Sequence, residues 1–297
     1  MKPKNIKFSY LILLKNFAYL LSVVLLMGCK PKHLSFQPNH DLKVVTYNVW
    51  VGYQDRKHPR LPCLEIGSER KSLIYEWLKE QEADVVVFQE LMDYSAEKLK
   101  NESKFWDHNY AVTLRDQGMA IGISSRYPIK VKEILTEGMQ HGLIYCTING
   151  VDIIATHLWP SFDHTILDEV NIVKERVDSS LKMRHPLLLL GDFNAFSPED
   201  ELFISDETMD LYKLWGWGLV DGRPNYQVIQ ALLNSGIKDV CTKFRKNDKA
   251  RKQRYDFIFA SPNLWNKCID ANHFQEAEFL RFSDHYPVTA TFSNIKN

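Results

Sequence analysis

The sequence predicts an α/β fold in which two β-sheets pack together and helices cover them on the outside. Eight short apolar runs have the composition of strands, and three segments have the spacing of helices. The two kinds of element are mixed along the chain without strict alternation, a pattern that suits two packed sheets. The 297 residues, 45% of them hydrophobic, are enough to bury one large core, and we expect one folded domain.

The predicted strands are rich in Val, Ile, Leu and Phe, which fit a buried pleated surface. They cover residues 44–49, 84–88, 119–124, 144–148, 151–155, 187–190, 255–260 and 288–292. The segment 200–226 has little periodicity and is predicted to be a loop-rich insertion. Its Trp215-Gly216-Trp217-Gly218 sequence carries aromatic rings that could pack in the core or stack on a base, a sugar or a lipid.

Three helices are predicted from the spacing of apolar residues. The first carries one apolar face, made of Leu73, Ile74, Trp77 and Leu78. The second has apolar residues spaced by three and four, at Ile166, Val170, Val173, Val177 and Leu181. The third covers residues 227–235 and ends at Gly236, a residue that commonly caps helices.

The N-terminal segment has the pattern of an export signal. Lys2, Lys4 and Lys7 precede an apolar stretch whose uninterrupted part, residues 17–27, is too short to cross a bilayer. It ends in Leu26-Met27-Gly28-Cys29, which resembles a bacterial lipobox, where the cysteine is lipidated and becomes the mature N-terminus.

We therefore expect a signal peptide over residues 1–28, a linker over 29–42 and the folded domain over 43–297. The domain would be exported and held on a membrane of the bacterial cell envelope by its lipidated Cys29. An ordinary N-terminal anchor helix is the alternative. We expect a monomer.

The formal charge excludes a strongly cationic protein. Net charge is zero over the whole chain, and without the four lysines of the signal segment 33 basic residues face 37 acidic ones, a balance of about −4. Basic residues crowd the twelve-residue segment from Lys243 to Arg254, which contains a single acid, Asp248. This run is either a solvated loop or a surface that attracts phosphate.

The cysteines beyond Cys29 do not predict a zinc site, because no CxxC-type spacing occurs. Export would permit a disulfide, but the sequence does not choose a pairing among Cys63, Cys146, Cys241 and Cys268. Cys146 lies in a predicted strand, where we expect a buried small apolar residue.

Acid, amide or imidazole groups stand at or near the ends of five predicted strands. These groups are Asn48, Glu90 after Gln89, His157, Asp192 and Asp256. A sixth segment, Ser283-Asp284-His285, precedes the last strand. Each alone is more often a turn former or a satisfied hydrogen-bonding residue. All six together are improbable by chance and predict a shared site.

Gly191-Asp192-Phe193-Asn194 is the most informative of these motifs. It follows the apolar run 187–190, so the strand delivers Asp192 and Asn194, two residues apart, to one side of its end. Polar groups at the edge of a core need partners. The pair could cap a turn, or it could bind a water molecule and a phosphate oxygen.

These residues resemble the endonuclease/exonuclease/phosphatase superfamily, which includes pancreatic-type deoxyribonucleases, abasic-site endonucleases, inositol polyphosphate 5-phosphatases and neutral sphingomyelinases. The resemblance runs from about Lys43 to Phe292 and rests on Gly191-Asp192-Phe193-Asn194 and Ser283-Asp284-His285. It implies a four-layer α-β-β-α sandwich, with two mixed sheets face to face and helices outside. It also implies a metal-dependent hydrolase of phosphate esters, phosphodiesters above all.

The resemblance assigns Glu90 as principal metal ligand, with Asn48 helping through its carbonyl and Asp284 from the opposite side. Oxygen donors without thiolates favour Mg²⁺, with Mn²⁺ or Ca²⁺ as alternatives. Some relatives carry an extra acid two residues after the Asn. Trp50 stands there in this chain, which predicts weaker metal binding or a single metal ion.

The same resemblance implies the catalytic roles. Asp192 would orient or deprotonate the attacking water, and Asn194 would bind the scissile phosphate. His285 with Asp256 resembles the family's His-Asp dyad, in which the carboxylate favours the charged imidazole. His157 matches a second histidine of the deoxyribonuclease and sphingomyelinase branches, a phosphate donor, although a satisfied strand-end histidine is the alternative.

The substrate stays open between nucleic acid and a lipid or sugar phosphate. The basic run favours nucleic acid or polyphosphate. Membrane tethering, the absence of global basicity, and Trp50 and Trp159 beside the site motifs favour the second class. A noncatalytic surface lipoprotein that binds phosphate-bearing ligands is the alternative from another class of protein.

Overall fold

The structure, a computed structural model, describes residues 41–160, 164–215, 218–244 and 254–295. The predicted signal peptide, Cys29, most of the linker, Trp217 and residues 245–253 of the basic run lie outside the described residues. Within the described ranges, no helix is both long enough and apolar enough to cross a membrane.

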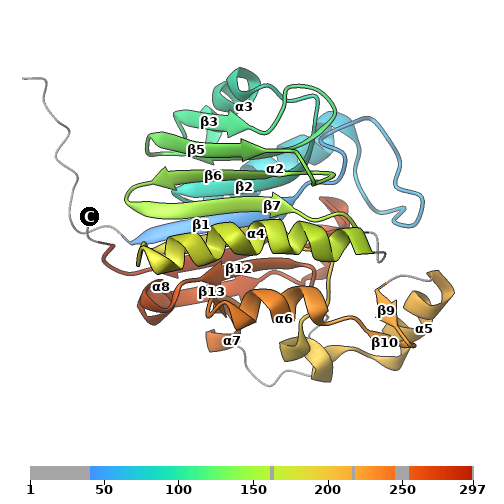
Figure 1. The fold of residues 1–297 in the computed structure, drawn as a ribbon. Helices are drawn as coiled ribbons and strands as arrows, with labels where there is room; N and C mark the ends of the chain where they lie inside the picture. The colour runs from blue at the N-terminus through green and yellow to red at the C-terminus, as the bar shows by residue number, and fades with distance from the viewer. Residues whose placement is uncertain (1–40, 161–163, 216–217, 245–253, 296–297) are drawn as a thin grey trace, which may run out of the picture. The chain divides into compact units, whose positions relative to one another are not determined.

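One sheet contains six strands in the order β13-β14-β1-β2-β4-β3 (Figure 1). The strands are β1 (Leu42–Asn48), β2 (Val85–Met92), β3 (Tyr110–Thr113), β4 (Met119–Ser125), β13 (Cys268–His273) and β14 (Val288–Phe292). Strands β1 and β2 are parallel, with Asn48 opposite Gln89, whereas β14 and β4 are antiparallel to these neighbours. Asn48 and Glu90 therefore come to the same edge of this sheet.

The second sheet also contains six strands, in the order β11-β12-β8-β7-β6-β5. They are β5 (Ile129–Leu135), β6 (Leu143–Ile148), β7 (Val151–His157), β8 (Leu187–Asp192), β11 (Lys238–Asp239) and β12 (Asp256–Ala260). Strands β7 and β8 are parallel, with His157 opposite Asp192. Strand β12 runs antiparallel to β8 and places Asp256 opposite Asp192.

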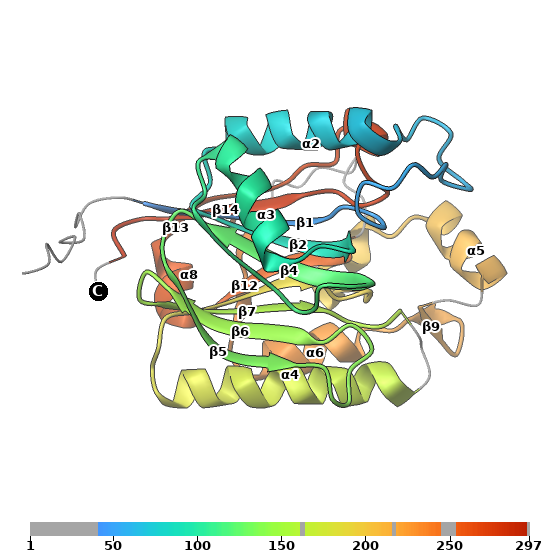
Figure 2. The ribbon, with the colours of Figure 1, turned by 90° about the horizontal axis from the view of Figure 1, so that it is seen from above.

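Helices cover the outer face of each sheet, as Figure 2 shows. Helices α2 (Gly67–Gln81) and α3 (Ala96–Ser103) lie over the first sheet, and α4 (His164–Lys182) and α6 (Gln227–Asn234) lie over the second. This arrangement confirms the predicted four-layer sandwich. The apolar faces predicted for α2 and α4 are buried at Ile74, Trp77, Val170 and Val173.

Three hydrophobic layers hold the sandwich together. The central layer lies between the sheets and includes Val87, Ile123, Leu188 and Ile258, all fully buried. Two further layers join each sheet to its covering helices. Each fully buried Val, Leu or Ile side chain contributes about 1.5–3 kcal/mol relative to an exposed one, so this packing fixes the strand ends that carry the site.

Smaller elements complete the described chain. They are α5 (Asp206–Trp215), α7 (Val240–Phe244), α8 (Pro262–Lys267), the short strands β9 (Leu219–Val220) and β10 (Arg223–Pro224), and the 3₁₀ turns η1 (Lys104–Trp106), η2 (Pro198–Phe203) and η3 (Ala277–Arg281). Helix α5 and η2 form within or at the start of the segment predicted to be loop-rich, so that prediction missed a helix.

The described cysteines carry free thiols, with Cys63 exposed and Cys146, Cys241 and Cys268 buried. The predicted burial of Cys146 is confirmed.

Candidate active site

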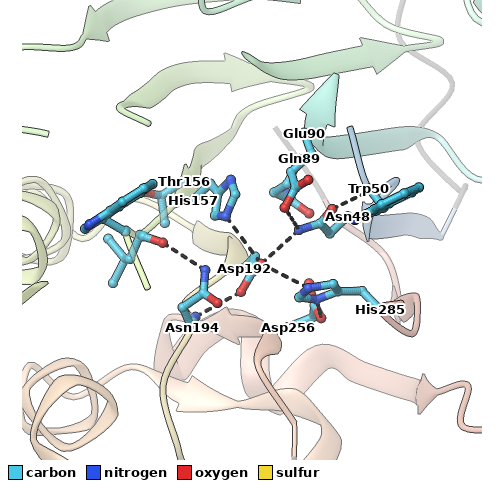
Figure 3. Close-up of polar contacts among 12 residues, drawn as sticks. Asn48, Trp50, Gln89, Glu90, Thr156, His157, Asp192, Asn194, Asp256 and His285 are labelled. Carbon is cyan, nitrogen blue, oxygen red and sulfur yellow. Dashed lines mark hydrogen bonds and ion pairs between the residues drawn. The ribbon is translucent and has the colours of Figure 1, made fainter. Parts of the chain in front are cut away.

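The polar residues predicted at the strand ends lie together where the parallel pairs β1–β2 and β7–β8 end. Figure 3 shows Asn48, His157 and His285 pointing toward Asp192, and Glu90 in contact with Asn48. The side-chain amide of Asn48 reaches across from one sheet to the other, and its Nδ2 donates to Asp192 Oδ2 at 2.9 Å. Packing of the two sheets therefore assembles the site.

Gly191 allows this approach. Its φ is +153°, and a Cβ atom there would lie 1.9 Å from the carbonyl oxygen of Thr156 on the neighbouring strand. No side chain fits that space. The glycine lets β8 end close against β7, which sets Asp192 beside His157.

Asp192 is the centre of the site and is fully buried. Its Oδ2 accepts from Asn48 and lies 3.4 Å from His157 Nε2 and 3.7 Å from His285 Nε2. Its Oδ1 accepts from the backbone N–H of Asn194 at 2.9 Å. Burial raises the pKa of Asp192 to about 7, against the lowering effect of the His285 charge. This carboxylate can take up a proton near neutral pH.

His285 and Asp256 form a pair, with His285 Nδ1 2.8 Å from Asp256 Oδ2. Burial would lower the pKa of His285, but the carboxylates of Asp256 and Asp192 raise it well above its usual value. Burial also raises the pKa of Asp256, and the His285 charge opposes that rise. We therefore assign His285 as an imidazolium whose Nδ1–H donates to Asp256 and whose Nε2–H faces Asp192.

The turn that carries His285 is anchored to β1. Ser283 Oγ donates to the carbonyl oxygen of Asn48 at 2.7 Å and accepts from the His285 backbone N–H at 3.2 Å. Ser283 thus ties the dyad to the strand that supplies Asn48.

His157 is almost fully buried, at 3% exposure. Its ring stacks on His141 with centroids 4.2 Å apart and planes 11° from parallel. Burial lowers the pKa of His157 well below its usual value, and burial with the nearby Arg115 charge lowers the pKa of His141 to about 4. Both rings are neutral at physiological pH, so His157 lies beside Asp192 as an uncharged imidazole, with Nε2 3.4 Å from Asp192 Oδ2.

Asn194 adopts a left-handed conformation with φ of 46°. Its Nδ2 donates to the carbonyl oxygen of Leu158 at 2.9 Å. That bond uses one of the two amide hydrogens. The Asn194 backbone N–H forms the turn contact with Asp192. Because Asn194 also lines the pocket described below, it can take part in this turn and still contact a substrate.

The sequence assigned a metal to Glu90, Asn48 and Asp284. Asn48 Nδ2 donates to Glu90 Oε1 at 3.0 Å, and Val51 N–H donates to Glu90 Oε2 at 2.9 Å. Burial raises the pKa of Glu90, with the His285 charge opposing and the Asp284 charge adding to the rise. Glu90, Asp284 and the Asn48 carbonyl are hard ligands, and this donor set fits Mg²⁺ or another hard divalent cation.

A second grouping of possible ligand atoms consists of Asp192, Asp256 and His285, whose atoms lie within 4.8 Å of one another. Here His285 Nδ1 is already engaged by Asp256. The hydrogen bond favours a proton-holding dyad over metal ligation at this position.

A pocket of about 600 Å³ opens over these residues. Asn194, Asp284 and His285 line it together with residues that carry no sequence motif, namely His58, Tyr212 and Tyr255. Sequence reasoning missed His58, which lies in a loop, and Tyr212, which lies in the unpredicted helix α5. Tyr255 belongs to the predicted strand 255–260, but it was not assigned to the site.

The two tryptophans expected beside the site differ in exposure. Trp50 is 9% exposed and Trp159 is 37% exposed. The Trp50 ring lies against Arg70 and His58, so it is not available to contact a substrate. Trp159 is accessible to a ligand.

Comparison with known proteins gives one family match and several solved structures with the same fold. The profile described as the Endonuclease/Exonuclease/phosphatase family matches residues 45–285. No curated protein matches the chain in sequence.

Several solved structures share the fold. An AP endonuclease from Archaeoglobus fulgidus is 20% identical with a TM-score of 0.62, over 84% of this chain and 99% of that one. A 3′-5′ exonuclease from Neisseria meningitidis is 21% identical with a TM-score of 0.63, over 85% of this chain and 100% of that one. A 3′ phosphatase from Neisseria, bound to a product DNA hairpin, is 22% identical with a TM-score of 0.62, over 85% and 99%. At these identities the likeness shows the fold.

Proposed function

Because this chain belongs to the endonuclease/exonuclease/phosphatase family, we propose that it is a Mg²⁺-dependent phosphodiesterase. The observation that carries the proposal is the buried Asp192, which contacts Asn48 and lies beside two histidines of different charge state. A buried carboxylate with a raised pKa beside an imidazolium is suited to proton transfer and to stabilising an anion.

In the proposed reaction, Asp192 orients a water molecule and accepts its proton as the water attacks phosphorus. The raised pKa of Asp192 matches this role near neutral pH. The His285 imidazolium, held by Asp256, stabilises the negative charge that grows on the phosphate oxygens. Asn194 and His157 donate hydrogen bonds to the same group.

Glu90, Asp284 and the Asn48 carbonyl would hold the cation. A bound Mg²⁺ would neutralise the phosphate and stabilise the leaving oxygen. The Asn48 amide lies between the two carboxylates and donates a hydrogen bond to each, to Glu90 and to Asp192. The carboxylate proposed to bind the metal and the carboxylate proposed to activate water are therefore separated by this amide.

We propose nucleic acid as the first substrate class. The Neisseria 3′ phosphatase was solved with a product DNA hairpin, and here Arg60 lines the pocket within an exposed loop that also holds Arg56 and Lys57. Such a loop suits a polyanion, and binding should weaken as salt rises. The buried position of Trp50 removes one reason to prefer a lipid.

Lipid or sugar phosphodiesters are the second candidate. The observation that favours them is the exposure of Leu214, 78%, on the helix whose Tyr212 lines the pocket, and of Leu202, 93%, on the preceding 3₁₀ turn. Exposed leucines near a pocket suit an apolar substrate or surface.

A comparative assay tests the function. The full-length protein, purified in detergent, should cleave bis-p-nitrophenyl phosphate with Mg²⁺ and lose activity in EDTA. Plasmid DNA and sphingomyelin in parallel reactions then separate the two substrate classes. Binding of Mg²⁺ and of phosphate ligands without turnover of any diester would instead support the noncatalytic lipoprotein.

We also propose export and lipid anchoring through Cys29, supported by the lipobox-like sequence. Metabolic labelling with palmitate in a bacterial host should label the wild-type chain and spare the Cys29→Ser variant. Equal labelling of both chains would contradict the anchor.

A further inference from the structure

His58 lies in the pocket beside Asp284, in the loop between β1 and α2. Its side chain is 10% exposed, and its ring centroid is 4.7 Å from that of Trp50. Beneath the tryptophan, the fully buried Arg70 donates to the carbonyl oxygen of Trp50 at 3.1 Å and also to that of Gly52. A buried helix side chain therefore fixes the start of the loop and the ring on which His58 packs.

Two backbone contacts set the orientation of the imidazole. His58 Nδ1 accepts from the N–H groups of Arg60, at 3.1 Å, and Leu61, at 2.9 Å. A nitrogen that accepts hydrogen bonds carries no proton, so the ring proton lies on Nε2. Nε2 is 3.3 Å from Asp284 Oδ2, and it is the donor in that contact.

The two oxygens of Asp284 thus have different surroundings. Oδ2 accepts from His58. Oδ1 lies 3.4 Å from Ser283 Oγ, but the Ser283 hydroxyl hydrogen is already donated to the Asn48 carbonyl at 2.7 Å. The Asp284 side chain is 27% exposed and faces the pocket, so Oδ1 is the oxygen that can meet a ligand there.

We propose that His58 is a positioning residue for Asp284: it holds Oδ2 so that Oδ1 stays available to the divalent cation. The inference rests on the proposed function, which makes Asp284 a ligand. Trp50 occupies the place of the extra acid, so few carboxylates share the cation and the orientation of each matters more. Hydrogen bonds that orient a metal ligand typically contribute about 10- to 100-fold in metal affinity.

Calorimetric titration of Mn²⁺ into the full-length protein, stripped of metal and without substrate, tests the proposal. His58→Phe keeps a ring to pack on Trp50 but removes the donor, and His58→Gln keeps an N–H donor. Gln54→Ala is the matched control, because Gln54 is exposed on the same loop. The dissociation constant should rise about 10- to 100-fold in His58→Phe, recover in large part in His58→Gln, and stay unchanged in Gln54→Ala.

An unchanged Mn²⁺ affinity in a folded His58→Phe protein would overturn the proposal, even if that variant melted earlier in EDTA, because a purely structural role would give that result. If His58→Phe fails to fold, His58→Leu carries the same prediction. Absence of Mn²⁺ binding by the wild-type protein would contradict the proposed function itself. Equal Mn²⁺ affinities in wild type, His58→Phe and His58→Leu would contradict only the role of His58.

Discussion

Asn48 joins the two carboxylates to which the proposed mechanism gives separate tasks, and Asn48→Asp tests that connection. The substitution keeps the shape of the side chain but replaces its NH₂ donor with an acceptor. The bonds from Nδ2 to Glu90, 3.0 Å, and to Asp192, 2.9 Å, would become contacts between carboxylate oxygens. The backbone N–H of Trp50, which donates to Oδ1, would keep its acceptor.

The expected loss follows from those two contacts. A hydrogen bond to an ionised group contributes about 1.5–3 kcal/mol, so two of them amount to about 3 kcal/mol or more. In a domain of this size each kcal/mol shifts the melting temperature by about 2–4 °C, which predicts a fall of roughly 6–12 °C. Protonation of one carboxylate relieves the repulsion, so the deficit should shrink as pH falls from 8 to 5.

Thermal unfolding in EDTA at several pH values measures this, with Asn48→Ala as the companion variant. Asn48→Ala removes the donor without adding charge, so its deficit should depend less on pH. An Asn48→Asp protein as stable as wild type at pH 8, or one with the same deficit at pH 5 and pH 8, would refute the connecting role.

Three further predictions concern stability. Gly191→Ala should cost about 3 kcal/mol or more by urea unfolding, because the new Cβ would lie 1.9 Å from Thr156 O; wild-type stability would contradict the close approach. Burial lowers the pKa of His108 to about 4. The neutral ring therefore contributes about 3 kcal/mol to the free energy of unfolding above pH 6.5, and this contribution is lost as pH falls from 6.5 toward 4. His108→Gln should flatten the plot of stability against pH in that range, and an unchanged plot would contradict the role of His108. Glu169 accepts from the N–H groups of Gln140 and Trp159 at 2.7 and 2.8 Å, so Glu169→Gln should lower the free energy of unfolding by about 1–3 kcal/mol. The control Glu175→Gln, at an exposed position, should stay within about 0.5 kcal/mol of wild type. Equal melting temperatures for the two variants would contradict the stabilising role of the Glu169 hydrogen bonds.

In the two six-stranded sheets, the strands that the sequence predicted are those with a neighbouring strand on each side. The short β9–β10 pair was not predicted. In both large sheets every inner strand was predicted, and the four that were missed, β3, β5, β11 and β13, are the four edges. An edge strand is half solvated, so its sequence need not be apolar. None of residues 129–135 is buried, and β13 carries Asp270 and Asn272. Apolar runs therefore reveal strands whose residues are mostly buried, whereas each of these edge strands contains exposed positions.

Polar residues of the site were predicted by type and strand end, but their contacts were not. Asn48 and Asp192 are 144 residues apart and belong to different sheets, so only the packing of the sheets brings them to 2.9 Å. His58 was missed for a different reason. It lies in a loop without periodicity, and its place is set by backbone N–H groups and by the buried Arg70. Such contacts leave no pattern in a single sequence.

The central claim is that Asp192 and His285 hydrolyse a phosphodiester, and initial rates on bis-p-nitrophenyl phosphate with saturating Mg²⁺ test it most directly. Asp192→Asn and His285→Ala should each lower kcat by about 10²- to 10³-fold or more, as the loss of groups that stabilise a developing oxyanion does. Asp178→Asn, on the exposed side of α4, is the control and should match wild type. Near-wild-type rates in folded Asp192→Asn or His285→Ala protein would contradict the account.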